Sequence, residues 1–341
     1  MYNRISNAVS AFSAAMVVAA GALLAGTAGS HAQDVEYPDV TLRLAHDIGE
    51  AHPTHQAMVR WQELLAERTG GKMKLQIFPN AILGSTDSQI TQLQEGSLDI
   101  VVIGGVSLLG KFNEEANIEL IPFLFSSNAS AMKAFDGAFG DWVAEKIIEP
   151  AGFKPMAYLI NGLRHAGTSV RPIVKPEDMA GLKFRVSNVA LLVEFFEEMG
   201  ATAVPMAFTE VFTALQQGTV DGFENPAAVF NANRFDEVTK YLSLTGHAFT
   251  SYVPIMNIEK FDAYPQEVRD VLMETAHEAA EYQHELMYAY EDQSVLDLAA
   301  RGMEVNEVDR DAFVAAVQPI WERFIAKYGD EGINLALEGQ K

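Results

Sequence analysis

The chain contains no cysteine. This absence excludes disulfide bonds, thiol catalysis, a lipid-anchored cysteine and metal sites with cysteine ligands. Basic residues are also scarce, with 24 Lys and Arg against 46 Asp and Glu, which gives a formal net charge of −22. Because nucleic acids and anionic membrane surfaces attract basic patches, we expect neither as a partner. A small anionic ligand is still compatible with this charge, since a pair of arginines can dominate the potential of its own cleft.

Long apolar runs are missing after residue 32, where none approaches the roughly 20 residues of a membrane-spanning helix. The run before it, Val9 to Leu24, follows Arg4 and leads to Ser30-His31-Ala32. A basic start, a short apolar segment and a small-x-small site are typical of a cleaved secretory signal. A membrane anchor is the alternative, but the run is short and rich in alanine. We therefore interpret residues 1–32 as a signal peptide and expect the remaining protein in a bacterial periplasm.

The remaining chain alternates strand and helix patterns. Apolar residues alternate over 40–44 and 73–77, as in strands, and follow a helical spacing over 53–70. A short helix up to Glu95 then leads to an apolar strand over 98–103. This βαβαβ order predicts an α/β fold with a parallel sheet and helices on both of its faces.

One motif occurs twice. Leu93-Gln94-Glu95-Gly96-Ser97-Leu98-Asp99 and Leu215-Gln216-Gln217-Gly218-Thr219-Val220-Asp221 each follow a strand, a proline and a helix. The glycine lies where the C-terminus of a helix favours a left-handed residue. Chance similarity of two helix ends is one explanation. We prefer two domains of similar architecture with a ligand cleft between them.

More than about 300 residues follow the signal, which is more than one core usually holds. A helix predicted from Pro265 to about Arg301 is long enough to lie across two domains or to bend between them. A last helix, from about Asp309 to Tyr328, must kink or break near Pro319. No linker separates the halves, so the chain should cross between domains several times, as in hinge-bending proteins. We assign residues 33–159 and about 250–287 to domain I, 160–249 and about 288–330 to domain II, and 331–341 to a C-terminal tail.

Arg185 lies within the apolar strand Gly181 to Val186. Alternation places it on the face opposite Phe184. A buried guanidinium is costly unless an anion meets its donors, and its planar fork matches a carboxylate. An ordinary solvated strand residue is the alternative. With the polar loop Glu224-Asn225-Pro226, this arginine suggests a site for a small carboxylate.

Short motifs along the chain, in a fixed order and spacing, are similar to those of one family. They are Leu44-Ala45-His46 with His52-Pro53, Thr69-Gly70-Gly71, Phe78-Pro79-Asn80 with Leu83-Gly84, Pro122-Phe123-Leu124-Phe125, Gly162-Leu163-Arg164, Arg171-Pro172-Ile173, Pro176-Glu177-Asp178, Gly181 to Val186, Gly200-Ala201 and Ala214 to Pro226. Together they make the chain resemble a solute-binding protein of a tripartite ATP-independent periplasmic (TRAP) transporter, of the DctP type. Phe223 departs from the pattern, because the family often has glutamine there.

The resemblance implies a two-domain clamshell fold that captures an organic acid and hands it to a membrane permease driven by an ion gradient. It also implies roles for individual residues. Arg185 matches the arginine that grips the ligand carboxylate, Arg164 matches a second arginine, and Asn225 matches an amide that binds the same carboxylate. Asn188 and Phe208 match a polar contact and an aromatic wall.

The first domain offers weaker candidates. Asp47 and His46 follow its first strand, and from the carboxyl end of that strand they could reach a hydroxyl group of the ligand. His46 could equally have a structural role. Thr86, Gly104 and Ser107, near the expected rim of the cleft, are small and uncharged.

Two other classes of function stay open. A periplasmic hydrolase or lyase would have to use paired carboxylates, because no Gly-x-Ser-x-Gly motif is present. A metal-binding protein could use His46, Asp47, His52 and His55, although Pro53 more simply marks the start of a helix. We expect a monomeric carrier without a cofactor or catalytic activity. Its cargo could be a C4-dicarboxylate, a sugar acid, a sialic-acid-like sugar, a keto acid or a sulfonate.

Overall fold

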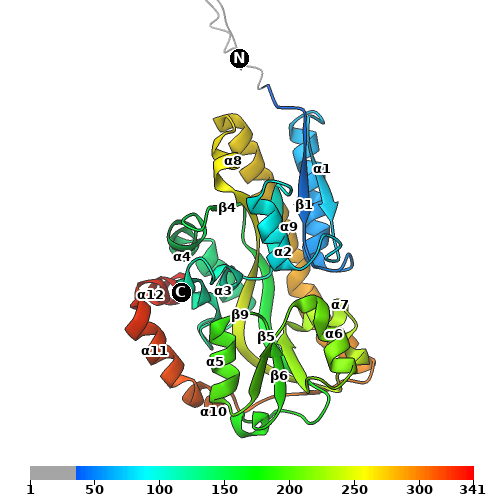
Figure 1. Ribbon diagram of the computed structural model, residues 1–341, viewed down its shortest axis with the longest axis vertical. Coiled ribbons are helices and arrows are strands. Elements are labelled where there is room, and N and C mark those ends of the chain that lie inside the picture. Colours follow the sequence, from blue (N-terminus) through cyan, green and yellow to red (C-terminus); the bar gives the residue numbers. More distant parts are fainter. Residues whose placement is uncertain (1–35) are drawn as a thin grey trace, which may run out of the picture. The chain divides into compact units, whose positions relative to one another are not determined.

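The computed structural model describes residues 36–341, so the predicted signal peptide lies outside the described residues. This part of the chain forms one mixed sheet with helices packed against it (Figure 1). The main path of the sheet runs in the order β2-β1-β3-β9-β5-β8-β6-β7, and β4 and β10 also pair with β9. The strands are β1 Val40–Ala45, β2 Met73–Phe78, β3 Ile100–Ile103, β4 Phe153–Pro155, β5 Leu159–Thr168, β6 Lys183–Val186, β7 Thr202–Pro205, β8 Gly222–Asn225, β9 Tyr241–Asn257 and β10 Glu304–Asn306.

Helices connect most of these strands, as expected for an α/β fold. The α-helices are α1 Pro53–Arg68, α2 Thr86–Gln94, α3 Asn128–Phe135, α4 Ala138–Val143, α5 Ala190–Glu198, α6 Phe208–Gln216, α7 Ala227–Ala232, α8 Ile258–Asp262, α9 Gln266–Ala300, α10 Arg310–Ala316, α11 Gln318–Tyr328 and α12 Glu331–Gly339. Shorter turns of helix are η1 Val106–Leu109, η2 Glu114–Leu120, η3 Ala144–Ile148, η4 Pro176–Met179 and η5 Phe235–Glu237.

The sheet contains two parallel sets of strands. In the first set β1 pairs in parallel with β2 and β3, and in the second β6 pairs in parallel with β7 and β8. The antiparallel strands β5 and β9 lie between these sets. Strand β9 is 17 residues long and pairs with β3 near its C-terminal end and with β5 along much of its length. The α/β prediction is confirmed, but the sheet as a whole is mixed and not parallel as expected. One copy of the repeated motif precedes β3 in the first set, and the other precedes β8 in the second.

The repeated motif has the same structure in both copies. Gly96 and Gly218 end α2 and α6 with positive φ values of 76° and 67°. The aspartate that closes each copy then accepts a hydrogen bond from the backbone of the neighbouring strand. Asp99 Oδ2 accepts from Arg43 N at 2.5 Å, and Asp221 Oδ2 accepts from Lys183 N at 2.8 Å. The motif therefore fixes the register of β3 against β1 and of β8 against β6.

The C-terminal third of the chain is helical. Helix α9 has 35 residues and packs against α1 and α7, so it contacts elements that flank both parallel sets. Its apolar residues are interspersed with charged ones, and within residues 36–341 no helix is long and apolar enough to cross a membrane. The predicted last helix is broken into α10 and α11, with Pro319 in the first turn of α11. The residues that we assigned to a tail form α12, which the sequence interpretation did not anticipate.

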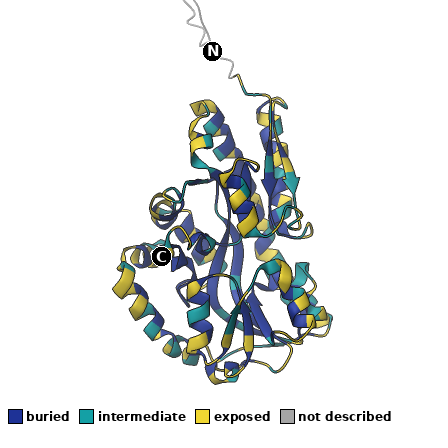
Figure 2. Cartoon of the chain, in the orientation of Figure 1, coloured by how far each residue is buried: buried dark blue, intermediate teal, exposed yellow. Residues whose placement is uncertain are grey.

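Burial follows the sheet (Figure 2). All four residues of β3 and all four of β8 are buried, as expected for central strands covered on both faces. In α1 the buried side chains recur at helical spacing, and the indole of Trp61 donates to Thr275 Oγ1 on α9 at 3.0 Å. This bond and the apolar packing around it hold α9 against the first set of strands.

Candidate functional site

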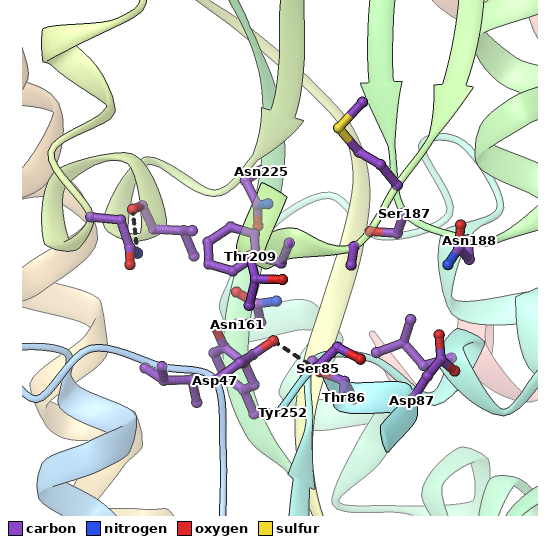
Figure 3. Close-up of a pocket in the computed structure, with 18 of the residues that line it drawn as sticks. Asp47, Ser85, Thr86, Asp87, Asn161, Ser187, Asn188, Thr209, Asn225 and Tyr252 are labelled. Atoms are coloured by element: carbon purple, nitrogen blue, oxygen red, sulfur yellow. Dashed lines mark hydrogen bonds between the residues drawn. The ribbon is translucent and has the colours of Figure 1, made fainter. Parts of the chain in front are cut away.

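A pocket opens where the parallel strands end (Figure 3). In open α/β sheets, ligands bind beyond the carboxyl ends of the strands, where loops and helix N-termini meet. Both parallel sets contribute in this way. The lining residues that follow strands of the first set are Asp47, Ile48, Ser85, Thr86, Asp87 and Gly104, and those at the ends of the second set are Arg185, Ser187, Asn188, Met206, Ala207, Phe208 and Asn225.

Arg185 is a buried cation in the wall of this pocket. It is only 2% exposed, and within residues 36–341 no Asp or Glu oxygen lies within salt-bridge distance of its guanidinium. Nε and Nη2 both donate to the backbone oxygen of Met206, at 3.1 and 2.8 Å, and Nη1 has no hydrogen-bond partner in the described part of the chain. Burial lowers the pKa of Arg185 to about 10, so the group is still charged at neutral pH. The ring of Phe208 lies 6.0 Å from the guanidinium carbon.

Arg164 also reaches the pocket from β5, but it has a counter-ion of its own. Its Nη2 donates to Glu224 Oε1 at 2.7 Å, Nε donates to Oε2 of the same carboxylate, and Nη1 donates to Thr250 Oγ1 at 3.1 Å. Neither charged side chain is more than 4% exposed. Burial alone would raise the pKa of Glu224, but the Arg164 guanidinium lowers it to about 2.

Asp47 lines the same pocket as these arginines and comes from the loop after β1 (Figure 3). Its Oδ2 accepts a hydrogen bond from Thr86 Oγ1 at 2.9 Å. Burial raises the pKa of this carboxyl group, and the Thr86 bond partly offsets the rise. The pocket therefore places an acidic side chain and an uncompensated arginine in the same enclosed space.

Comparison with known proteins identifies the family. The model of a family described as bacterial extracellular solute-binding protein, family 7, matches residues 44–328. The chain belongs to this family. It is 35% identical over 279 residues to the 2,3-diketo-L-gulonate-binding periplasmic protein YiaO of Escherichia coli K12, an alignment that covers 81% of this chain and 84% of YiaO.

Solved structures of similar solute-binding proteins agree with this family assignment. A TRAP periplasmic solute-binding protein from Roseobacter denitrificans with bound β-D-glucuronate is 32% identical, with a TM-score of 0.83 over 87% of this chain and 99% of that chain. The sugar acid binding protein DctPAm from Advenella mimigardefordensis, in complex with galactonate, is 29% identical, with a TM-score of 0.85 over 89% of this chain and 98% of that one. The prediction of a TRAP solute-binding protein with the two-domain fold of that class is confirmed.

Six of the seven candidate ligand residues line the pocket of this family 7 protein. They are Arg185, Arg164, Asn225, Asn188, Phe208 and Asp47. Asn225 is 6% exposed at the end of β8, whereas Asn188 is exposed at the rim. Their roles as ligand contacts remain predictions, because the position of a side chain in a wall does not by itself show binding. Of the three small rim positions, Thr86 and Gly104 line the pocket, whereas Ser107 donates its backbone N–H to the buried Glu119.

His46 is the candidate that does not line the pocket. Its Nδ1 accepts from Ile48 N at 3.2 Å, which leaves Nε2 to donate to His55 Nδ1 at 3.1 Å. Burial and the neighbouring His55 lower the pKa of His46 to about 3, so the ring is neutral. These contacts agree with the structural alternative, in which His46 shapes the turn after β1.

The sequence did not lead us to Asn161 as a site residue, and it suggested His52 only as a metal ligand. Both are buried polar side chains in the pocket wall. Asn161 Oδ1 and His52 Nε2 have no hydrogen-bond partner among the described residues. His52 caps α1, and its Nδ1 accepts from Thr54 N at 3.1 Å. Because the ring is neutral, with its pKa lowered by burial to about 3, Nε2 carries the proton and is a donor. In the sequence, the His52-Pro53 pair indicated only the start of a helix. That position was the one signal that His52 lies at the end of an element, where pocket residues are common.

Two remaining expectations can be placed in the fold. Phe223, which departs from the family pattern, is fully buried and packs its ring 4.3 Å from the centres of both Phe230 and Phe235, so it belongs to the core behind the pocket. The metal-binding alternative finds no support within residues 36–341, where no group of three or more His, Asp or Glu side chains is placed to hold a metal ion.

Proposed function

We propose that this protein is the extracytoplasmic binding component of a TRAP transporter, which captures a small organic acid through Arg185 and delivers it to membrane permease subunits. The observation that carries this proposal is the buried guanidinium without a carboxylate partner. A buried cation is destabilising unless an anion compensates it. Arg185 lines the pocket, and its Nη1 has no hydrogen-bond partner among residues 36–341. A carboxylate is the planar anion that this fork of donors fits best.

The relatives support this ligand class. Diketogulonate, glucuronate and galactonate, the ligands of the proteins compared above, are all acids with a single carboxylate. The extracellular description of the family, the periplasmic relative YiaO and the predicted signal peptide support the periplasm as the site of action. The two parallel sets of strands are the proposed halves of the clamshell, with the domain limits given above.

Capture requires no chemistry. In an open form, Arg185 is accessible from the cleft, and the ligand carboxylate binds to it first. Closure removes water and lowers the local dielectric constant, which strengthens the charged hydrogen bonds. The ligand shifts the population toward the closed form only as far as it binds that form more tightly. The permease would then recognise the closed protein.

The test is a thermal-shift and calorimetric screen of organic acids, using protein that was unfolded and refolded to remove bound ligand. A ligand at a hundred times its dissociation constant should stabilise the fold by about 2.7 kcal/mol, which is a shift of several degrees. Arg185→Ala should abolish tight binding without loss of the fold. Arg60→Ala, a change of an exposed arginine outside the pocket, is the matched control and should bind normally.

Unchanged affinity in Arg185→Ala would refute the Arg185 contact. The two other classes of function give different results in the same screen. A hydrolase or lyase would convert the acid, whereas a carrier returns it unchanged. A metal-binding protein would be stabilised by a divalent cation and by no acid.

A further inference from the structure

The amide of Asn161 is a buried polar group that the protein itself does not satisfy. The residue is 2% exposed, its Oδ1 has no partner among residues 36–341, and it lines the pocket between the two sets of strands (Figure 3). Buried polar atoms in native proteins are almost always hydrogen-bonded, so an exception calls for an explanation. A bound ligand is the explanation that fits an orphaned atom in a pocket wall.

The backbone of β5 is distorted at this residue. Ile160 pairs with Ser251 of β9 and Gly162 pairs with Thr250, so Asn161 is an extra residue without a counterpart. Such a bulge re-aims a side chain, and bulges are frequent next to functional sites. Gly162 has φ +127°, and a Cβ added there would lie 3.2 Å from the Cβ of Pro226. The bulge is therefore packed directly against the Asn225-Pro226 turn and holds Asn161 in place beside it.

The charges of the pocket wall allow for one ligand carboxylate. Arg164 and Arg185 are the cationic side chains among the lining residues that the structure describes, and Arg164 is already paired with Glu224. Of the lining acids, Asp87 pairs with Lys111 at 3.3 Å, whereas Asp47 forms no salt bridge within residues 36–341 and accepts a hydrogen bond from the neutral Thr86 hydroxyl. One carboxylate would compensate Arg185. A second would have no cation to meet and would share the pocket with Asp47.

We propose that Asn161 and Asp47 make this pocket select acids with one carboxylate and a hydroxylated chain, and reject dicarboxylates. This inference rests on the proposed function. A hydroxyl group both donates and accepts, so it satisfies the Asn161 amide in either orientation, can donate to Asp47 and can accept from His52 Nε2. The methylene groups of a plain fatty or dicarboxylic acid satisfy none of these atoms. A site built to bind a hydroxyl group rejects an analogue that lacks it, because its polar atoms are then left unpaired.

Four six-carbon acids separate the effect of charge from that of hydroxylation. Gluconate has one carboxylate and a hydroxylated chain, galactarate has two carboxylates and a hydroxylated chain, hexanoate has one carboxylate alone, and adipate has two. Affinities of the refolded protein for each are measured by calorimetry, with glucuronate added as a cyclic form of the preferred class. We expect gluconate or glucuronate to bind at least about 100-fold more tightly than hexanoate, adipate or galactarate.

Two variants test whether Asp47 and Asn161 are the residues that select the ligand. Asp47→Asn should raise the affinity for galactarate relative to that for gluconate by at least about tenfold, because it removes a negative charge that repels the second carboxylate. Asn161→Leu should lower the affinity for gluconate by at least about tenfold, and the affinity for hexanoate should stay the same or rise. Asp262→Asn, which removes the same charge from an exposed side chain outside the pocket, is the control and should leave all ratios unchanged. Asp47→Asn keeps the size of the side chain, so it tests the proposal even if Asn161→Leu folds poorly.

Adipate or hexanoate binding as tightly as gluconate would overturn this inference, and so would ratios that neither variant changes. In both cases binding through Arg185 would still support the proposed function. If no acid of the wider organic-acid screen bound, the proposed function would fail and this inference with it. Binding that persisted in Arg185→Ala would refute the Arg185 contact, on which both depend.

Discussion

The carboxylate of Glu224 holds the guanidinium of Arg164 with both of its oxygens, and the pair lies in the wall of the pocket with almost no exposure to solvent. The two residues are 60 positions apart and come from the paired antiparallel strands β5 and β8. Arg164 therefore differs from Arg185, which has the same chemistry in the same pocket but no protein carboxylate. From this difference we expect Arg164 to contribute mainly to the stability of the fold and Arg185 to be the arginine that is available to a ligand.

Arg164→Met should destabilise the protein strongly, because it leaves the Glu224 charge buried without its partner. Removing one member of a buried ion pair typically costs about 3–5 kcal/mol. Chemical denaturation of the ligand-free protein measures this loss. Arg323→Met is a suitable control, since Arg323 forms half-exposed ion pairs with Glu194 and Glu198 on the surface, and its loss should cost about 1 kcal/mol or less. Equal effects of the two substitutions would contradict the structural role of Arg164.

The same pair makes a prediction about pH. The pKa of Glu224 is lowered from 4.5 to about 2 in the folded protein, so the folded state holds its proton less tightly than the unfolded state. The stabilisation is complete above the unfolded pKa and is lost as pH falls from about 4.5 toward 2. Its magnitude is on the order of 3 kcal/mol. Unfolding free energies measured from pH 7 to pH 3 should show the difference between wild type and Glu224→Gln shrinking below about pH 5. A difference that stayed constant would show that Glu224 has the same pKa in the folded and unfolded states.

The elements of the fold could be predicted because their signals are local. The apolar alternation over 40–44, the proline at the start of α1 and the glycines that end α2 and α6 each act within a few residues of the chain. Arg185 was also identifiable, because a cation in an apolar strand is unusual wherever the strand lies. Domain limits and the roles of the ligand residues remain predictions.

The unforeseen features depend on contacts between distant segments. The partner of Arg164 follows from the pairing of β5 with β8, which no local pattern specifies. Asn161 reaches the pocket because of a shift in register between β5 and β9, and a bulge of this kind has no clear signature in one strand. Helix α12 is only nine residues long, and its buried residues pack against segments distant in the sequence, so no local signal set it apart from a tail.

Gly167 should not tolerate a side chain. A Cβ built there would lie 2.2 Å from the ring of Phe230, which is itself fully buried. Gly167→Ala should therefore cost about 1–3 kcal/mol or more, through displaced packing of the core. Gly218→Ala is the comparison, because no atom lies within 4 Å of its added Cβ and only its positive φ of 67° opposes the change. Its cost should be about 1 kcal/mol. Thermal unfolding of both variants shows which one loses more stability. A smaller loss in Gly167→Ala than in Gly218→Ala would refute the packing argument.

His52 combines a stabilising role with a proposed role in the pocket, and two substitutions can separate these. Asparagine also caps helices well, so His52→Asn should retain about 1 kcal/mol of stability that His52→Ala loses. Both variants lack the Nε2 donor, so both should bind a hydroxylated acid more weakly than the wild type, and to a similar extent. Calorimetry and denaturation of the two proteins provide the comparison. Normal affinity in His52→Asn would exclude Nε2 as a ligand contact.

Strand β9 takes part in both halves of the sheet. Residues near its C-terminal end pair with β3, and others pair with β5 and β10. If either half unfolded alone, the other would keep an unpaired strand edge, which is costly and prone to aggregation. The halves should therefore lose their structure together, in one cooperative transition. The same covalent continuity means that a hinge motion must bend intact strands, so the range of opening is limited by the elasticity of the sheet.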